Sequence, residues 1–169
     1  MEKKMDKYKI SITKLRNCND SKTLIESCLG GDYSMLYNGM VLSTEEIAST
    51  ILNNNTVFII EYADNSVGLL TLSSEYEIRL FINPEYQHIG IGTNALKLVE
   101  YLLMDDENCN RIEAYVTEDN RICIQMLNHE GYNLSGEEKE VNTNNKRLVL
   151  NKYVKRINNS QMWVILIFP

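Results

Sequence analysis

The sequence has little of what metal centres and disulfide frameworks are built from. Among 169 residues there are four cysteines and two histidines, with no CxxC pair, no HxH and no HExxH motif. Structural metal sites need clustered ligands of these types, so we expect no metal. The N-terminus, MEKKMDKYKISITKL, lacks the apolar core of a signal peptide. The cysteines are therefore predicted to be reduced thiols in a cytoplasmic protein.

Positive charge and long apolar runs are also scarce. The formal net charge is -6, whereas binding to nucleic acid normally requires a basic face. The apolar C-terminal run MWVILIFP is much shorter than the roughly 20 residues of a membrane-spanning helix. We therefore expect neither nucleic acid nor a membrane as a partner.

What the chain does contain is a succession of strand and helix patterns without a repeat or a low-complexity linker. These patterns predict one domain over residues 1–155, followed by an apolar tail, 156–169, that adds a strand or contacts a second copy in a homodimer. The expected fold class is α/β (α+β): a mixed, mostly antiparallel sheet with helices on both faces and one strand–helix–strand crossover. Strands are expected at 8–15, 56–63, 67–73, 76–82, 110–117, 139–142 and 146–154, and helices at 20–29, 43–52, after Gly92 and within 118–132.

Two glycines open the helix that follows the fourth expected strand. In EYQHIGIGTNAL, residues 85–96, Gly90 and Gly92 occupy positions where glycine costs about 1 kcal/mol relative to alanine. The first N–H groups of a helix are unpaired and carry partial positive charge, and glycine lets an anion approach them closely. The pair indicates either a phosphate-binding turn or a tight strand-to-helix turn without a ligand.

Two phosphate-binding motifs fit this segment. GIGTNA, residues 90–95, matches the dinucleotide fingerprint G-x-G-x-x-A. That fingerprint follows its strand directly and opens the first strand–helix unit, whereas here NPEYQHI separates Ile82 from Gly90 and most strands come earlier. The second motif, Q/R-x-x-G-x-G/A, is matched by Gln87 and the two glycines. Neither of these two objections applies to it.

The second motif resembles the acyl-CoA pyrophosphate loop of the GNAT N-acetyltransferase superfamily, and the resemblance covers residues 76–132. EIRLFINPEYQHIGIGTNAL is similar to that superfamily's fourth strand, proline turn, loop and third helix. NRICIQMLNHEGY is similar to its next helix, N-x-x-S-x-x-x-x-x-K-x-G-F, with Cys123 in place of serine and His129 in place of lysine. The motif style is closest to the ribosomal-protein alanine/serine N-terminal acetyltransferase branch.

The resemblance implies acetyl-CoA (coenzyme A) as the cofactor, held between the fourth and fifth strands. The free edge of strand 76–82 would pair with the pantetheine arm, and the glycine loop would hold the pyrophosphate. The implied cofactor-binding residues are Phe81, Ile82, Asn83, Gln87, His88, Ile89, Gly90, Ile91, Gly92, Thr93, Asn120 and Cys123.

The implied reaction is direct attack of a primary amine on the thioester in a ternary complex. A carboxylate acting through water is the usual base, and Glu77 and Glu113 are the candidates. Leu127 stands where many members carry a tyrosine that protonates the leaving thiolate. This leaves a water acid, unassisted departure, or a non-catalytic acyl-CoA-binding or regulatory domain. A covalent mechanism through Cys123 would need a base that the nearby sequence lacks.

The acceptor is the least determined part of the prediction. In this superfamily, acceptor loops come from the region that corresponds here to GGDYSMLYNGMVL, residues 30–42. Tyr33 and Tyr37 in this segment could contact an amine by cation–π interaction. A small-molecule amine and a peptide N-terminus both remain open as acceptors.

Overall fold

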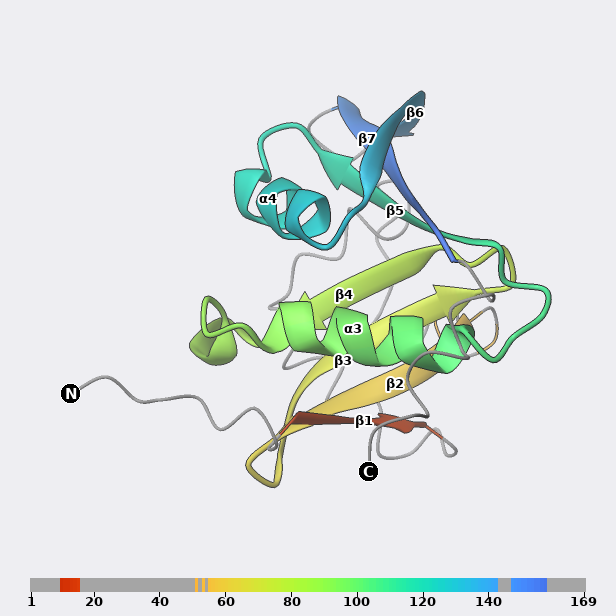
Figure 1. Ribbon diagram of the computed structural model, residues 1–169. Helices are drawn as coiled ribbons and strands as arrows, with labels where there is room; N and C mark the ends of the chain where they lie inside the picture. The colour runs from red at the N-terminus through yellow and green to blue at the C-terminus, as the bar shows by residue number, and fades with distance from the viewer. Residues whose placement is uncertain (1–9, 16–50, 52, 54, 143–146, 158–169) are drawn as a thin grey trace.

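The computed structural model describes residues 10–15, 51, 53, 55–142 and 147–157, and within them seven strands form two antiparallel sheets (Figure 1). The first sheet has the order β1-β2-β3-β4 and the second the order β5-β7-β6. The strands are β1 (Ile10–Lys14), β2 (Asn55–Tyr62), β3 (Asn65–Ser73), β4 (Ile78–Ile82), β5 (Arg111–Thr117), β6 (Asn133–Asn142) and β7 (Arg147–Arg156).

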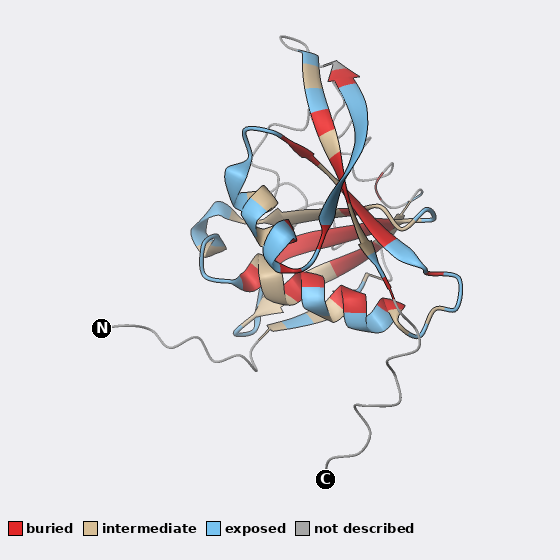
Figure 2. Ribbon diagram, turned by 45° about the horizontal axis from the view of Figure 1, so that its top comes forward, coloured by how far each residue is buried: buried red, intermediate tan, exposed pale blue. Residues whose placement is uncertain are grey.

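Helix α3 (Ile91–Leu103) lies across the first sheet, and α4 (Arg121–His129) lies beside β5. One face of α3 is apolar at helical spacing, which is why the helix buries that face against the sheet. Figure 2 shows the buried strands beneath it. The buried α3 residues of the core are Ile91, Ala95, Leu96, Val99 and Leu103.

The two sheets meet at a single point between β4 and β5. Glu77 and Glu113 form an isolated parallel bridge, and the Glu113 N–H donates to the Tyr76 carbonyl at 3.0 Å. No further ladder joins the two strands within the described residues, and they belong to separate sheets. One edge of β4 is therefore left without a partner strand beyond this bridge.

The expected fold class is confirmed, and the expected strands and the two later helices are present with small shifts at their ends. The largest difference is β6, which begins at Asn133 rather than at Lys139. The added segment, NLSGEE (133–138), is exposed and mostly polar, so it lacks the apolar alternation that would indicate a strand. It forms because it pairs with β7, with a register shift between Leu134 and Glu138.

Some expectations fall on residues that the structure does not describe. The helix expected at 20–29 and most of that expected at 43–52 lie outside the described residues, although Ile51 is helical and 4% exposed. Strand β7 runs to Arg156 and Ile157 is buried, whereas residues 158–169 are not described. The division into a domain and a tail remains a prediction.

A buried ion pair connects α3 to the second sheet. Glu100 is 5% exposed, and its Oε2 atom lies 2.6 Å from Nζ of Lys155 on β7. Removing one partner leaves an uncompensated buried charge. We expect Lys155→Met to lower the free energy of unfolding by about 3 kcal/mol in urea titration.

A surface ion pair provides the control for that measurement. Arg147 pairs with Glu140, and both side chains are more than half exposed. Pairs of this kind contribute about 1 kcal/mol or less, so Arg147→Met should leave the unfolding midpoint almost unchanged. Equal losses in the two variants would show that the pair with Glu100 has no special role.

Candidate active site

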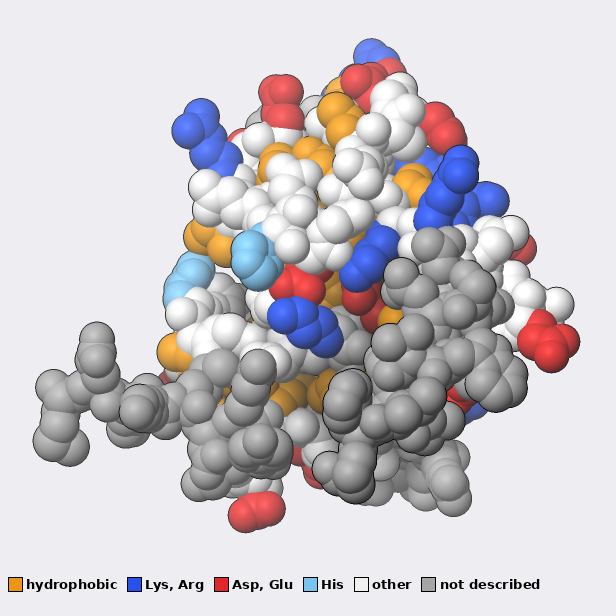
Figure 3. Space-filling model, viewed as in Figure 1, with side chains coloured by type: hydrophobic (Ala, Val, Ile, Leu, Met, Phe, Trp, Pro, Cys, Tyr) orange, Lys and Arg blue, Asp and Glu red, His pale blue; other side chains and the backbone are white. Residues whose placement is uncertain are grey.

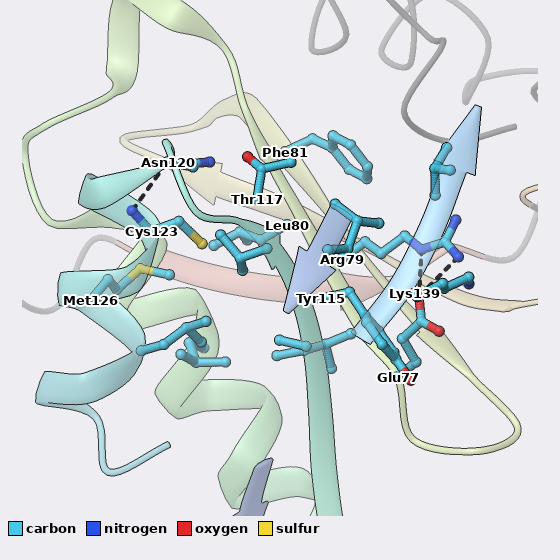
Figure 4. Close-up of a pocket in the computed structure, with 17 residues that line it drawn as sticks. Glu77, Arg79, Leu80, Phe81, Tyr115, Thr117, Asn120, Cys123, Met126 and Lys139 are labelled. Atoms are coloured by element: carbon cyan, nitrogen blue, oxygen red, sulfur yellow. Dashed lines mark hydrogen bonds and ion pairs between the residues drawn. The ribbon is translucent and has the colours of Figure 1, made fainter. Parts of the chain in front are cut away.

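The gap between β4 and β5 contains a cavity of about 230 Å³ (Figure 4). Strand β4 forms one wall, β5 and α4 form another, and the hairpin of β6 and β7 closes one end. The lining residues are Glu77, Ile78, Arg79, Leu80, Phe81, Leu96, Ala114, Tyr115, Val116, Thr117, Asn120, Cys123, Met126, Leu127, Lys139, Val141 and Leu150.

The pairing of β4 with β3 decides which main-chain groups face the cavity. The Asn83 N–H donates to the Val67 carbonyl at 2.9 Å, and a Cβ added to Gly68 would lie 2.4 Å from the Phe81 carbonyl oxygen. Phe81 and Asn83 therefore direct main-chain groups toward β3. Because successive residues of a strand alternate in direction, Leu80 and Ile82 direct theirs toward the cavity.

This geometry changes the expected set of main-chain contacts. Of the three strand residues predicted to bind a ligand through the backbone, Ile82 faces the unpaired edge, and its carbonyl accepts a hydrogen bond from Gln87 Nε2 at 2.9 Å. Phe81 lines the cavity with its side chain. Leu80 was not predicted, because the sequence does not reveal which strand β4 pairs with.

A short 3-10 helix, η2 (Pro84–Tyr86), carries the chain from β4 toward the glycine loop. The Asn83 side chain accepts a hydrogen bond from the Glu85 N–H at 3.1 Å and caps this turn. His88 then has φ 61° and Gly90 has φ 84°. Glycine suits the left-handed backbone at position 90 because it has no Cβ.

The loop ends at the start of α3 with several free amide groups. The first helical hydrogen bond is donated by the Asn94 N–H to the Gly90 carbonyl at 3.1 Å. Within the described chain, no acceptor is recorded for the N–H groups of Ile91, Gly92 and Thr93. Helix N-termini of this kind bind phosphate groups. Ile89, just before the helix, is 42% exposed.

Gly92 has a packing role that the sequence did not reveal. A Cβ at this position would lie 3.2 Å from Leu80 Cδ2 and 3.5 Å from Met126 Sδ. Both neighbours line the cavity. The missing side chain therefore allows α3 to approach β4 and α4 closely at the wall of the site.

Helix α4 contributes both of the residues that the sequence assigned to it. The Asn120 side chain caps the helix by accepting a hydrogen bond from the Cys123 N–H at 3.2 Å. Burial raises the pKa of the Cys123 thiol, which is therefore protonated at neutral pH. Leu127 is 1% exposed and also lines the cavity, so the wall is apolar at the position where the sequence has leucine in place of the superfamily's common tyrosine.

The two candidate bases occupy different places. Glu77 lines the cavity with a side chain that is 19% exposed, and its Oε1 atom accepts from Arg79 Nε at 2.9 Å. No partner is recorded for its Oε2 atom among the described residues. This oxygen is free to accept a proton through water.

Glu113 is not part of the cavity lining. It lies in a separate depression, where its Oε1 atom is 2.6 Å from Arg111 Nε and 3.1 Å from Lys152 Nζ. Burial raises the pKa of Glu113, but the hydrogen bonds from these two cations outweigh burial and hold its pKa below the ordinary value. Glu113 is therefore a structural ion-pair partner rather than a group poised to take up protons.

The remaining predictions concern the acceptor. Tyr33 and Tyr37 lie outside the described residues. The cavity is also lined by Arg79, Tyr115 and Lys139, which lie near Glu77 and which the sequence did not indicate (Figure 4). They come from three strands that are distant in sequence, so no local motif could have identified them.

Comparison with known proteins gives a family match. The model of the acetyltransferase (GNAT) family matches residues 26–132. No curated protein matches the chain in sequence.

Solved structures match in fold at low sequence identity. The ribosomal-protein α-N-acetyltransferase RimL in complex with coenzyme A has a TM-score of 0.73 and 14% identity over 90% of this chain and 96% of its own. Spermidine N-acetyltransferase from Vibrio cholerae, in complex with CoA and spermine, has a TM-score of 0.73 and 17% identity over 88% and 96% of the chains. A putative acetyltransferase from Salmonella typhimurium with acetyl-CoA has a TM-score of 0.67 and 11% identity over 88% and 94%.

Proposed function

Because this chain belongs to the acetyltransferase (GNAT) family, we propose that it transfers an acetyl group from acetyl-CoA to a primary amine. The observation that carries the proposal is the separation of β4 and β5 over a cavity, with Gly92 of the glycine loop packed close to two of its lining residues, Leu80 and Met126. Structures of similar fold contain coenzyme A or acetyl-CoA, which supports the same donor here.

The described residues fit such a donor in both shape and polarity. The unpaired edge of β4 offers main-chain groups of Leu80 and Ile82 to an extended polar arm, which would bind like an added strand. The amides of Ile91, Gly92 and Thr93 suit a pyrophosphate. Asn120 and Cys123 lie on the opposite wall, beside the arm.

The chain's own residues supply the proton transfer and the polar contacts. Acetyl-CoA, when bound, provides an activated thioester. Glu77 is the proposed base, because its free Oε2 atom can take the amine proton through a water molecule while Arg79 holds the carboxylate in place. The Leu80 N–H is the proposed donor to the developing oxyanion.

The proton for the leaving thiolate has no obvious source at position 127. Leu127 carries no hydroxyl, and the hydroxyl groups in the described cavity lining belong to Tyr115 and Thr117. A water acid and unassisted departure therefore both remain open. The same leucine also favours the alternative function, a non-catalytic acyl-CoA-binding or regulatory domain.

A thiol-release assay with acetyl-CoA and a panel of primary amines tests the proposal, together with calorimetry of CoA binding. We expect CoA to bind and thiol to be released only when an amine is present. CoA binding without release for any amine would favour the non-catalytic alternative. Absence of CoA binding would contradict both functions.

Cys123 is expected to have no covalent role in the reaction. Thiolates rather than thiols are the nucleophiles of cysteine enzymes, and burial keeps this side chain protonated. We expect Cys123→Ala to retain kcat within about threefold. Acetylated Cys123 in mass spectra after incubation with acetyl-CoA alone, together with an inactive alanine variant, would show that a covalent step exists.

The cellular setting is also part of the proposal. No helix in the part of the chain that the structure describes is long and apolar enough to cross a membrane. A cytoplasmic location and a homodimer formed through the apolar tail remain predictions from the sequence.

A further inference from the structure

Charged side chains gather at the end of the cavity farthest from the glycine loop. Glu77 immediately precedes β4, Arg79 lies on β4, and Lys139 lies on β6 (Figure 4). Arg79 is engaged by Glu77, with Nη2 and Oε1 2.9 Å apart. This pair brings one negative and one positive charge, so its contribution to the net charge of the cavity is zero.

The register of the second sheet places Lys139 on the face that lines the cavity. Thr117 pairs with Leu150 across β5 and β7, and Leu150 pairs with Lys139 across β7 and β6. Directly paired residues project to the same face of a sheet. All three residues line the cavity, so Lys139 is at the edge of the site rather than on its outer surface.

Neighbouring charged residues on this sheet neutralise one another, whereas Lys139 has no such partner. Lys152 Nζ lies 3.1 Å from both Glu113 Oε1 and Glu137 Oε2. No carboxylate lies within ion-pair distance of Lys139 among the described residues. Its Nζ atom lies instead 5.3 Å from the centroid of the Tyr115 ring.

Contact with an aromatic ring positions an ammonium group without neutralising its charge. The Lys139 charge is therefore available to a bound anion, and a charge-assisted hydrogen bond to a carboxylate would be favourable. A polyamine would instead bring further positive charge beside Lys139, and such like-charge contacts discriminate against the wrong partner. The described side chains on the face shown in Figure 3 carry charges of both signs.

We propose that Lys139 binds an anionic group of the acceptor, so that the substrate is a primary amine carrying a carboxylate or a similar anion rather than a polyamine. The inference rests on the proposed acetyl transfer and specifies its acceptor. The amine of such a substrate would be directed toward Glu77, while its anion would contact Lys139 above Tyr115.

Three amines of equal length separate the effect of charge from the effect of size. γ-Aminobutyrate, n-butylamine and 1,4-diaminobutane differ only in an anionic, neutral or cationic far end. The peptides Ala-Glu-Ala and Ala-Lys-Ala, both amidated at the C-terminus so that only the middle side chain is charged, compare an anion with a cation for an N-terminal amine. The two sets distinguish a small acid from a peptide. We expect kcat/KM to be about tenfold or more higher for the anionic member of at least one set.

Variants then identify the residue responsible. Lys139→Met should abolish the preference, Lys139→Arg should retain it, and Lys139→Glu should reverse it toward the cationic members. Lys14→Met, on an exposed part of β1, is the matched control and should change nothing. Calorimetric affinity for CoA should be the same in all four variants.

Binding of the anionic amines to the CoA-loaded protein gives a readout that does not depend on turnover. If the anionic amines bind to the wild type but not to Lys139→Met, the inference is supported even without acetyl transfer. In that case only the proposed function fails. A wild-type preference for 1,4-diaminobutane or Ala-Lys-Ala would overturn the inference. So would an unchanged preference in Lys139→Met, or failure of every anionic amine to bind.

Discussion

Replacing Glu77 with glutamine is expected to lower kcat about 100-fold or more, because removing a positioned general base typically costs between about 10² and 10⁴ in rate. Glutamine keeps the size of the side chain and the contact of its oxygen with Arg79, but it cannot take up a proton. The affinity for CoA should not change, since Glu77 lies away from Asn120 and Cys123, the proposed contacts of the CoA arm (Figure 4). Steady-state kinetics and calorimetry measure the two effects separately.

Glu113→Gln is the matched control, because the two glutamates are bridge partners on neighbouring strands. Glu113 holds ion pairs with Arg111 and Lys152 outside the cavity, so its loss should affect stability rather than chemistry. A variant with normal stability and a large loss of kcat would make Glu113 the better candidate for the base. Unchanged kcat in Glu77→Gln would remove Glu77 from the mechanism.

The effect of Glu113→Gln on the free energy of unfolding should also depend on pH in a definite direction. The pKa of Glu113 is lowered in the folded protein from an ordinary value of 4.5. Its stabilising contribution is therefore present above pH 4.5 and is lost as pH falls toward the lower folded value. The stability difference between wild type and Glu113→Gln should accordingly narrow in acid.

Gly90→Val is expected to weaken CoA binding by about tenfold or more. Gly90 has φ 84°, a left-handed conformation that costs a β-branched residue about 1–3 kcal/mol. A loop that shifts to relieve this strain no longer directs the free amides of Ile91 to Thr93 toward one anion. A loss of 1.4 kcal/mol corresponds to about a tenfold change in the dissociation constant, which calorimetry can detect.

Gly136→Val is the control that distinguishes the effect of backbone strain from an effect on CoA binding. It has φ 83° on β6, and a Cβ there would meet nothing within 4 Å. Gly136→Val should therefore impose comparable backbone strain and a comparable loss of stability, with normal affinity for CoA. If Gly90→Val binds CoA as tightly as Gly136→Val does, the glycine loop does not hold the pyrophosphate.

Part of the site could be read from the sequence because its signals are local. The glycine turn before α3 and the helix that follows it each depend on residues within one or two turns. The placement of Glu77 in the cavity also follows from the strand that leads into this loop. Phe81, Asn120 and Cys123 line the cavity, and their binding to a cofactor stays a prediction.

Other features of the site and the fold could not be predicted from the sequence, because they depend on strands that are distant in sequence. Glu113 was a candidate base in the sequence, but one of its two ion-pair partners, Lys152, lies 39 positions later on β7. The early start of β6 likewise depends on pairing with β7 rather than on its own polar residues.

The sequence by itself determined the order of the strands and helices and the turn that bares the amides of α3, since backbone conformation and helix periodicity are set by neighbouring residues. Only the tertiary structure decided that Leu80 rather than Phe81 directs its main chain into the gap, because that direction depends on which side of β4 is paired with β3. The tertiary structure also decided that Lys139 lines the cavity beside Tyr115, with no carboxylate of the described residues at ion-pair distance. A charge is neutralised by whatever the fold brings next to it, and the sequence does not specify that neighbour.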